Sequence, residues 1–424
     1  MRHASLAASL VLVACAPPHG QQEFRLRVAL VGPLKSLAPG SEPSYSVYAE
    51  PWVFESLLRT ADDGSPRPAL ASDFQFSGPA QMAMRIRAGA KFSDGSPVTA
   101  EDIRNSLRAA RIEVREQGDT LLVESPSGAP IEPLLRFEPI FKRVGDQYVG
   151  SGPFQVVSID AERILLRRRA PAAGRITEVL LLGFPTAREA FARTLAGDAD
   201  LLIVTDPKQL EFFQGIRRLR IVRGRSVGAI SVAMGLRRLS RSERRAIAAA
   251  LPVAKMSQLV FGDECRPFAP NETAANPTSI ARPLEIAVLA EDPQLEHMGL
   301  AVARALGSRA KGVRRVSAQE ALELFRSQDF DLMMTRPLVW PPSSAALVWE
   351  SDSPRNESGY RNPKMDAALK AGDWARALQE LRDDPPAAFI CSPERLALVD
   401  SRVKNPQLNG DQYLGTLPDW EVEE

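Results

Sequence analysis

One stretch, from Met84 to Leu107, constrains the fold of this chain more than any other. Its first residues alternate between apolar and polar side chains, which is typical of a β-strand with one buried face. Ser93-Asp94-Gly95 then favours a turn, and Pro97 prevents the strand from continuing. Thr99 is a good helix N-cap, and Asp102 three residues later completes a capping box. The stretch therefore predicts a strand, a turn and a helix that runs through Leu107.

Several segments of the chain match the sequence signature of a known family. Residues 92–97 read Phe-x-Asp-Gly-x-Pro, and residues 99–102 read Thr-Ala-Glu-Asp. Residues 149–154 are close to the family's Gly-Thr-Gly-Pro-Tyr/Phe segment, and residues 359–366 match its Gly-Tyr-x-Asn-Pro-x-x-Asp segment. In these segments the chain resembles the family 5 extracytoplasmic solute-binding proteins, which serve ABC importers of dipeptides, oligopeptides and nickel. The resemblance runs from about Leu26 to the C-terminus.

The resemblance implies an α/β fold, specifically the two-lobed periplasmic-binding-protein fold of the class II type. In that fold, mixed sheets flanked by helices form two lobes, and crossing hinge segments join them. The length of 424 residues agrees with this expectation, because a single core stops growing near roughly 250–300 residues. We expect lobe I at 24–226, lobe II at 227–392 and a return to lobe I at 393–424. Lobe I would include a reduced subdomain at 108–148.

An internal repeat also favours two lobes. The segment from Thr186 to Leu201 recurs as Ser317 to Leu332, with each matched residue offset by 131. Both copies predict a capped helix that enters a strand, and each follows a predicted strand, at 176–182 or 313–316. Strand, helix and strand form a right-handed βαβ unit, so each lobe would contain one. Chance similarity of two ordinary βαβ units is the alternative.

Comparison with the family leads to predictions for two segments of lobe I, one that resembles the family and one that departs from it. Residues 53–58 resemble a helix of the family. Between Leu107 and Val149, where familiar members insert a sizeable subdomain, little more than a hairpin is predicted, with its turn at 117–119. We therefore expect a more open cleft, or a ligand smaller than a long peptide.

The N-terminus indicates export. An apolar run from Leu6 to Val13 is too short to span a bilayer but suits a signal peptide, which we place at 1–14. The run ends at Leu-Val-Ala-Cys15, which resembles a bacterial lipobox, so Cys15 is the predicted lipidation site and 15–23 the tether. The alternative is ordinary secretion with an incidental cysteine. The prediction is a periplasmic or extracytoplasmic protein, held to a membrane by its lipid.

The charge balance excludes some classes of partner. The chain has 53 Lys and Arg against 52 Asp and Glu, a formal net charge of +1, so nucleic acid is not an expected partner. The arginine runs at 167–169 and 217–218 are interpreted as solvated faces, because neither has a glycine-rich anion cradle beside it.

Enzyme chemistry and metal binding are not expected. His297 is the only histidine after the predicted leader and tether, so no Ser-His-Asp set and no metal site can be built around it. No Gly-x-Ser-x-Gly elbow occurs, and no cofactor is predicted. Cys265 and Cys391 are the cysteines of the mature body, and the sequence leaves open whether they pair.

Eight residues are candidates for contact with a ligand in the cleft. They are Glu42, Ser44, Tyr45, Tyr48, Arg336, Trp340, Pro341 and Tyr360. Counting against the oligopeptide-binding members places Glu42 and Ser44 where cleft residues touch the ligand backbone. A surface role for Glu42 and Arg336, and plain core packing for Trp340, are the alternatives.

One departure from the peptide-binding members bears on the ligand. Those members carry an aspartate that receives the α-ammonium group of a peptide, whereas this chain has no acidic residue between Asp331 and Glu350. A buried ammonium without a partner costs several kcal/mol, so free-amine peptides are disfavoured. Arg336 would suit a carboxylate instead.

The sequence thus predicts a monomeric solute-binding lipoprotein. It would capture a small solute, peptide-like or other, between its lobes and deliver it to the permease subunits of an ABC importer. The alternative is a degenerate family member that kept the fold and acts as a sensor or assembly lipoprotein without transport.

Overall fold

The structure of this chain is a computed structural model. It describes residues 24–423, apart from 33, 35, 40–45, 62, 171, 205–206, 225, 227, 263–264, 268–279, 281, 291, 338–343, 345–347 and 409–413. Cys15 and the rest of the predicted leader and tether therefore lie outside the described residues. Within the described part, no helix combines the length and the apolar character of a membrane span.

The first lobe, here called lobe I, is organised around a seven-stranded sheet with the strand order β10-β11-β12-β1-β13-β21-β14. Its strands are β1 Arg25–Val31, β10 Phe154–Ile159, β11 Arg163–Arg168, β12 Glu178–Phe184, β13 Leu201–Val204, β14 Leu219–Gly224 and β21 Arg395–Asp400. The three central strands β12, β1 and β13 are parallel. Their apolar residues pack on one face with α1 (Ser46–Val53) and on the other with α4 (Ala187–Ala196) and η1 (Pro207–Phe213).

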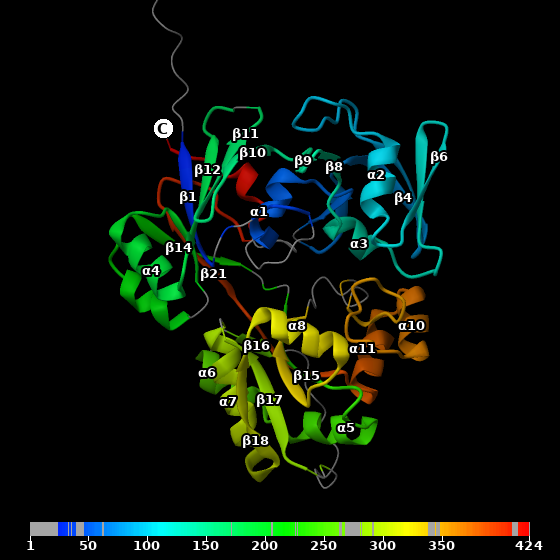
Figure 1. The fold of residues 1–424 in the computed structure, drawn as a ribbon, viewed down its shortest axis with the longest axis vertical. Helices are drawn as coiled ribbons and strands as arrows, with labels where there is room; N and C mark the ends of the chain where they lie inside the picture. Colours follow the sequence, from blue (N-terminus) through cyan, green and yellow to red (C-terminus); the bar gives the residue numbers. More distant parts are fainter. Residues whose placement is uncertain are drawn as a thin grey trace, which may run out of the picture.

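A smaller sheet with its own core lies beside the main sheet of lobe I (Figure 1). Its order is β4-β5-β7-β6, from β4 Ala71–Gly78, β5 Gln81–Ile86, β7 Thr120–Glu124 and β6 Glu113–Gln117. Helix α2 (Ala100–Leu107) covers it. The flanking elements are α3 Glu132–Phe137 and the strand pairs β2 Leu58–Thr60 with β3 Pro66–Pro68 and β8 Phe141–Val144 with β9 Gln147–Gly150.

The second lobe, lobe II, contains a six-stranded sheet with the order β16-β20-β15-β19-β17-β18. Its strands are β15 Ile230–Met234, β16 Cys265–Pro267, β17 Leu284–Leu289, β18 Ala310–Val316, β19 Leu332–Thr335 and β20 Ala387–Pro393. Its helices are α5 Arg241–Ala250, α6 Val253–Phe261, α7 Pro293–Leu306, α8 Ala318–Ser327, α10 Pro363–Lys370 and α11 Trp374–Asp383. Short 3₁₀ turns are η3 Gly307–Arg309 in this lobe and η5 Leu417–Asp419 near the C-terminus.

The chain crosses between the lobes twice. The first crossing leads from β14 in the seven-stranded sheet to β15 in the six-stranded sheet. The second leads back from β20 to β21 through Glu394. Figure 1 shows the two lobes one above the other, with these segments running between them. The two-lobed α/β fold that the sequence predicted is therefore the observed fold.

The predicted internal repeat is a structural repeat. In lobe I, β12, α4 and β13 form a βαβ unit with β1 between the strands, and in lobe II, β18, α8 and β19 do the same around β17. Thr186 caps α4 by accepting from the backbone N–H of Glu189, and Ser317 caps α8 in the same way through Glu320.

The organising stretch of the sequence folds as predicted, into β5, a turn and α2. Thr99 accepts from the backbone N–H of Asp102, and the Asp102 carboxylate accepts from the backbone N–H of Thr99 at 2.9 Å, so the capping box is confirmed. The predicted hairpin is also present, as β6 and β7. Helix α3 and the β8–β9 pair were missed, because six- and four-residue elements carry too little periodicity to be recognised.

One element of lobe I is placed differently from the prediction. The helix expected at 53–58 lies earlier, because α1 ends at Val53 and β2 begins at Leu58. Gly150 and Gly152 explain this ending, since a Cβ on either glycine would collide with the backbone carbonyl groups of Trp52 and Val53. The Gly-x-Gly-Pro segment therefore serves the close passage of one backbone past another.

Cys265 and Cys391 form a disulfide, with their Cα atoms 5.6 Å apart. The bond joins β16 to β20, the strand that leads into the second crossing. The question that the sequence left open is thus settled in favour of pairing in this structure.

Candidate functional site

Two of the predicted ligand-binding residues, Tyr48 and Arg336, lie in opposite lobes, and the charge of Arg336 acts on Tyr48. Tyr48 lies on α1 and packs against the core of lobe I, whereas Arg336 follows β19 in lobe II. Burial raises the pKa of the Tyr48 phenol, and the positive charges of Arg395 and Arg336 oppose that rise. The negative charge of Asp292 adds to it. Charges of lobe II thus act on a phenol of lobe I, and we call Tyr48, Arg336, Asp292, Gln294 and Arg395 the cluster at the lobe boundary.

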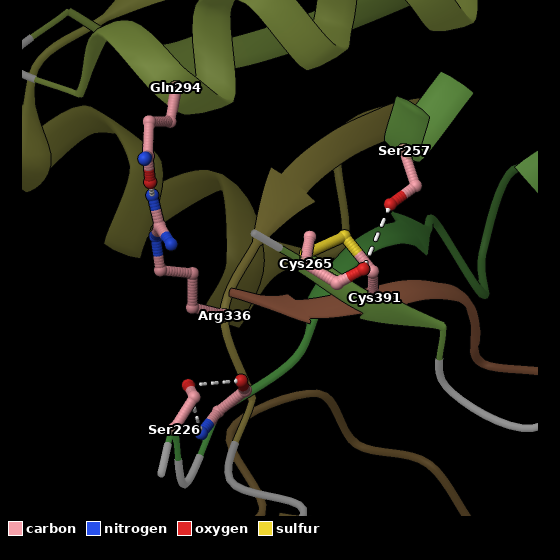
Figure 2. Close-up of a disulfide and its surroundings, with 7 residues drawn as sticks. Ser226, Ser257, Cys265, Gln294, Arg336 and Cys391 are labelled. Atoms are coloured by element: carbon pink, nitrogen blue, oxygen red, sulfur yellow. Dashed lines mark hydrogen bonds between the residues drawn. A yellow bond between two sulfur atoms is a disulfide. The ribbon is translucent and has the colours of Figure 1, made fainter. Parts of the chain in front are cut away.

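Arg336 is held by partners within its own lobe. Its Nε donates to Asp292 Oδ2 at 3.0 Å, and its Nη2 donates to Asp292 Oδ1 at 3.1 Å and to Gln294 Oε1 at 2.8 Å. Figure 2 shows the guanidinium directed at the Gln294 amide. The sequence predicted a cation available for a carboxylate ligand, and the structure corrects this, because Asp292 already neutralises the arginine.

The arrangement follows from the ends of the lobe II strands. Arg336 comes directly after β19, and Asp292 comes shortly after the parallel strand β17 and caps α7. Both therefore lie at the carboxyl edge of the sheet, which is where open α/β sheets bind ligands.

The first crossing is tied to the same loop. Ala229 donates its backbone N–H to the carbonyl of Pro337 at 3.1 Å. Ser226 shapes the turn before it, donating its hydroxyl to the carbonyl of Gly228 at 2.8 Å, as Figure 2 shows. A movement of this crossing would therefore also displace Pro337 and its neighbour Arg336.

Tyr360 does not reach this site. Its side chain is 2 % exposed and packs edge-on against Trp349, with the ring centroids 6.0 Å apart. Its hydroxyl donates to the carbonyl of Asp384 at 3.0 Å and accepts from Asn362 at 3.0 Å, and burial raises its pKa to about 12. The structure places Tyr360 in the core of lobe II and not in the predicted ligand site. Its ring packs against Trp349, and its hydroxyl is hydrogen-bonded within the lobe.

The remaining candidates cannot be placed. Glu42, Ser44, Tyr45, Trp340 and Pro341 all lie outside the described residues. In the part of the chain that is described, no group of three or more His, Cys, Asp or Glu side chains is arranged to hold a metal ion.

Three residues of the cluster were missed by sequence reasoning, namely Asp292, Gln294 and Arg395. Asp292 carried a recognisable signal, because an aspartate before Pro293 and after an apolar strand is a typical helix N-cap. Arg395 carried none, since its place beside Tyr48 depends on the return of the chain from lobe II.

The arginine run at 167–169, predicted to be a solvated face, is a structural clamp. Arg167 pairs with Glu178 at 3.0 Å. Arg168 donates to the carbonyl groups of Ile176 and Pro418, both at 2.6 Å. The contacts of Arg168 could not be foreseen, because backbone carbonyl acceptors leave no signal in the pattern of side chains.

Comparison with sequences identifies no relative. No protein-family model matches this chain, and no curated protein matches it.

Comparison with solved structures gives many similar folds. The oligopeptide-binding protein AppA of Bacillus subtilis, solved with a nonapeptide, has a TM-score of 0.78 at 16% identity, covering 95% of this chain and 100% of its own. The NikA protein of Staphylococcus aureus, solved with Ni(L-His)2, has a TM-score of 0.75 at 14% identity, covering 94% and 100%. These identities are low, so the similarity establishes the fold.

The murein tripeptide binding protein MppA of Escherichia coli adds information on the lobes. One of its structures has a TM-score of 0.76 at 16% identity and covers 95% of this chain and 99% of its own. Its unliganded open form covers 95% and 98% at 15% identity, but the TM-score is 0.66. This chain therefore superposes less well on that open form than on the other MppA structure. The chain has the two-lobed fold shared by these peptide- and nickel-complex-binding proteins, as its sequence signature predicted.

Proposed function

We propose that this protein is an extracytoplasmic solute-binding protein that captures a small solute between its lobes for an ABC importer. The observation that carries the proposal is that the charges of Arg336 and Asp292 in lobe II act on the buried phenol of Tyr48 in lobe I. A ligand held between these groups would draw the lobes together, because hinge closure is how two-lobed binding proteins trap their ligands. The fold shared with binding proteins supports the same conclusion.

The charges at the lobe boundary favour a neutral or anionic solute. Arg336 and Arg395 bring two positive charges to Tyr48, and Asp292 brings one negative charge. The Asp292 carboxylate is occupied by Arg336, so an incoming α-ammonium group would have to displace a bidentate ion pair. Free-amine peptides are therefore disfavoured relative to N-acetylated peptides and small carboxylates.

Calorimetry tests both parts of this proposal. Native mass spectrometry of the purified protein first identifies what co-purifies, and that compound is then titrated beside di- and tripeptides, their N-acetylated forms and small carboxylates. Tyr48→Phe should weaken binding about tenfold, the effect of losing one buried hydrogen bond. Arg336→Ala should weaken binding of an anionic solute by a similar factor, because it removes a positive charge and leaves the Asp292 carboxylate unpaired. Arg361→Ala, whose side chain is 73% exposed in lobe II, is the matched control. Tight binding of free-amine peptides that N-acetylation abolishes would contradict the ligand class.

A sensor or assembly role without transport is the second candidate. Uptake of the identified solute distinguishes this role from the importer role. A deletion strain would lose that uptake only if the protein serves an importer. Unchanged uptake in that strain, with binding intact in vitro, would favour the sensor.

The proposal includes a lipid anchor at Cys15, which rests on the resemblance of residues 12–15 to a lipobox. Cys15→Ser should move the protein from the membrane fraction to the soluble fraction, because the lipid is the proposed attachment. Persistence in the membrane fraction would contradict the anchor without touching the solute-binding proposal.

A further inference from the structure

A cavity of about 710 Å³ opens on lobe I away from the lobe boundary. All of its lining residues belong to lobe I, so it is separate from the cluster around Tyr48 and Arg336. The polar groups that line it include Arg59, Arg87, Ser151, Gln155, Arg168 and Arg169. The volume lies within the range of about 300–1,000 Å³ that is usual for sites of small organic ligands.

Two adjacent arginines in this wall are bonded only to neutral groups. Arg169 donates from Nη1 to the carbonyl groups of Ser151 and Gly152, at 2.8 and 3.1 Å, and from Nη2 to those of Lys91 and Phe92, at 2.9 and 2.8 Å. Arg168 donates from Nε and Nη2 to carbonyl groups, and its guanidinium lies 4.8 Å from the centre of the Phe154 ring. Neither has a carboxylate within ion-pair distance among the described residues.

The electrostatics of these two residues differ from those of the other arginines. Burial lowers the pKa of Arg168 and of Arg169. Arg175 lowers that of Arg168 further and Asp419 opposes it, whereas for Arg169 the charges of Glu55 and Asp94 oppose the shift without reversing it. Elsewhere in the described chain, the arginine pKa shifts that are resolved are upward, because a carboxylate hydrogen-bonds the guanidinium, as at Arg27 and Arg282. The cavity wall therefore holds positive charge that the protein itself compensates poorly.

Further donors in the cavity are uncommitted. Arg59 is exposed, and its side chain makes no hydrogen bond or ion pair with any described residue. Ser151 is 6% exposed, and its buried hydroxyl has no partner. A buried hydroxyl without a partner costs free energy and is rare unless something else occupies the site.

The carboxylates of the cavity do not cancel this charge. Glu55 accepts hydrogen bonds from both Nη atoms of Arg87 at 2.9 Å, so these two charges neutralise each other. Asp419 is the other carboxylate in the lining, against Arg59, Arg168 and Arg169. An excess of two positive charges remains.

We propose that this cavity is a second binding site, which takes a small organic molecule or headgroup that bears a phosphate or a carboxylate. The anion would meet the guanidinium of Arg59 and Nη1 of Arg168, which donates to no described residue, and Gln155 would supply a neutral donor. The rest of the volume accommodates the organic part.

Calorimetry with glycerol phosphate and with citrate tests the site in the full-length protein. Arg59→Ala and Gln155→Glu should each weaken binding about tenfold or more, the first by removing a charge-assisted bond and the second by adding a negative charge. Both side chains lie at the surface of the cavity, and circular dichroism verifies that the variants fold. Arg188→Ala, an exposed arginine on α4, is the matched control and should bind like the wild type.

Vesicles distinguish a soluble anion from a lipid headgroup. If the ligand is a lipid headgroup, the protein should float with phosphatidylglycerol vesicles more than with phosphatidylcholine vesicles, and Arg59→Ala should reduce this flotation. If the ligand is a soluble anion, Arg59→Ala should weaken binding in calorimetry and leave flotation unchanged. The proposal is overturned by absence of saturable binding in every arm, or by equal affinity in Arg59→Ala, Gln155→Glu and the wild type. Weakening by Arg336→Ala but not by Arg59→Ala would place the anion at the lobe boundary and also overturn it.

Discussion

Asp200 and Asp331 occupy the same position in the two lobes, each directly before the second strand of a βαβ unit. Asp200 accepts the backbone N–H of Arg27 at 2.9 Å, and Asp331 accepts that of Glu285 at 3.1 Å. Each also accepts from two guanidinium nitrogens of one arginine, and Asp331 accepts a third from Arg238. Arg27 binds Asp200 at 2.8 and 2.7 Å, and Arg282 binds Asp331 at 2.9 and 2.6 Å. In each lobe this carboxylate ties the central strand to the strand that follows the helix.

Asp331→Asn should strongly destabilise lobe II. The side chain of Asp331 is only 5% exposed and accepts a backbone N–H, and its partner Arg282 is 46% exposed, so the loss should be about 1–3 kcal/mol, the cost of buried hydrogen bonds. Asp329→Asn is the matched control, because Asp329 is 67% exposed and its pair with Arg238 at 2.6 Å should contribute about 0–1 kcal/mol. Urea unfolding monitored by circular dichroism measures both. Equal losses in the two variants would refute a special role for Asp331.

The same carboxylate predicts a pH dependence. Burial alone would raise the pKa of Asp331, but hydrogen bonds from Arg282 and from the backbone of Glu285 outweigh it and lower the pKa from 3.8 to about 2. A carboxyl whose pKa is lower in the folded state stabilises the protein above its unfolded pKa, and that stabilisation is lost as pH falls through the folded value.

The free energy of unfolding of the wild type should therefore fall between pH 3.8 and about 2, and more steeply than that of Asp331→Asn. Asp400, whose pKa is also lowered, keeps its contribution in the variant, so the difference between the two curves isolates Asp331. Parallel curves would show that Asp331 does not carry this dependence.

Much of the fold was predictable because its signals are local or repeated. The capping box of Thr99 and Asp102 needs only three residues of spacing, and the offset of 131 between Asp200 and Asp331 is visible in the printed sequence. The family signature then indicated how the βαβ units are arranged in two lobes.

The site was predicted less well because its contacts are not local. Arg336 binds Asp292, which is 44 residues away in the sequence, and the charges of both act on Tyr48 across the lobe boundary. Tyr360 matched the signature, but its tyrosine is required for packing against Trp349, a reason that sequence similarity does not reveal. Sequence patterns indicate which residue types a site of this family contains. Which of these residues come together depends on the path of the chain through both lobes.

Loss of the disulfide should destabilise the protein. The bond closes a loop with a sequence separation of 126 between Cys265 and Cys391, and removing a bond that closes so long a loop costs roughly 2–5 kcal/mol. The double variant Cys265→Ser, Cys391→Ser should unfold at lower urea concentration than the oxidised wild type. Treating the wild type with reductant is the control, and it should reproduce the shift. An unchanged midpoint in both experiments would contradict a stabilising role.

An ion pair across the lobes should favour the arrangement seen here. Arg355 of lobe II donates to Glu138 Oε1 of lobe I from Nη2 at 2.8 Å and from Nε at 3.1 Å. Nearby, Lys370 donates to the carbonyl of Ser127 at 3.4 Å, and Val348 packs against the cores of both lobes. In Figure 1, α3 lies on the side of lobe I that faces α10 and α11. These contacts hold lobe II against the small sheet of lobe I.

Arg355→Ala should therefore shift the ligand-free protein toward a more open arrangement. The pair is partly exposed, at 50% and 11%, so its loss should cost about 0.2–1 kcal/mol and change the population of lobe arrangements more than the melting temperature. Small-angle scattering should show a larger radius of gyration without ligand, and saturation with the identified solute should reverse the increase. Arg326→Ala, which removes a 2.8 Å pair with Glu357 inside lobe II, is the matched control. A radius of gyration that is the same in Arg355→Ala and the wild type, or that rises equally in Arg326→Ala, would show that Arg355 does not hold the lobes together.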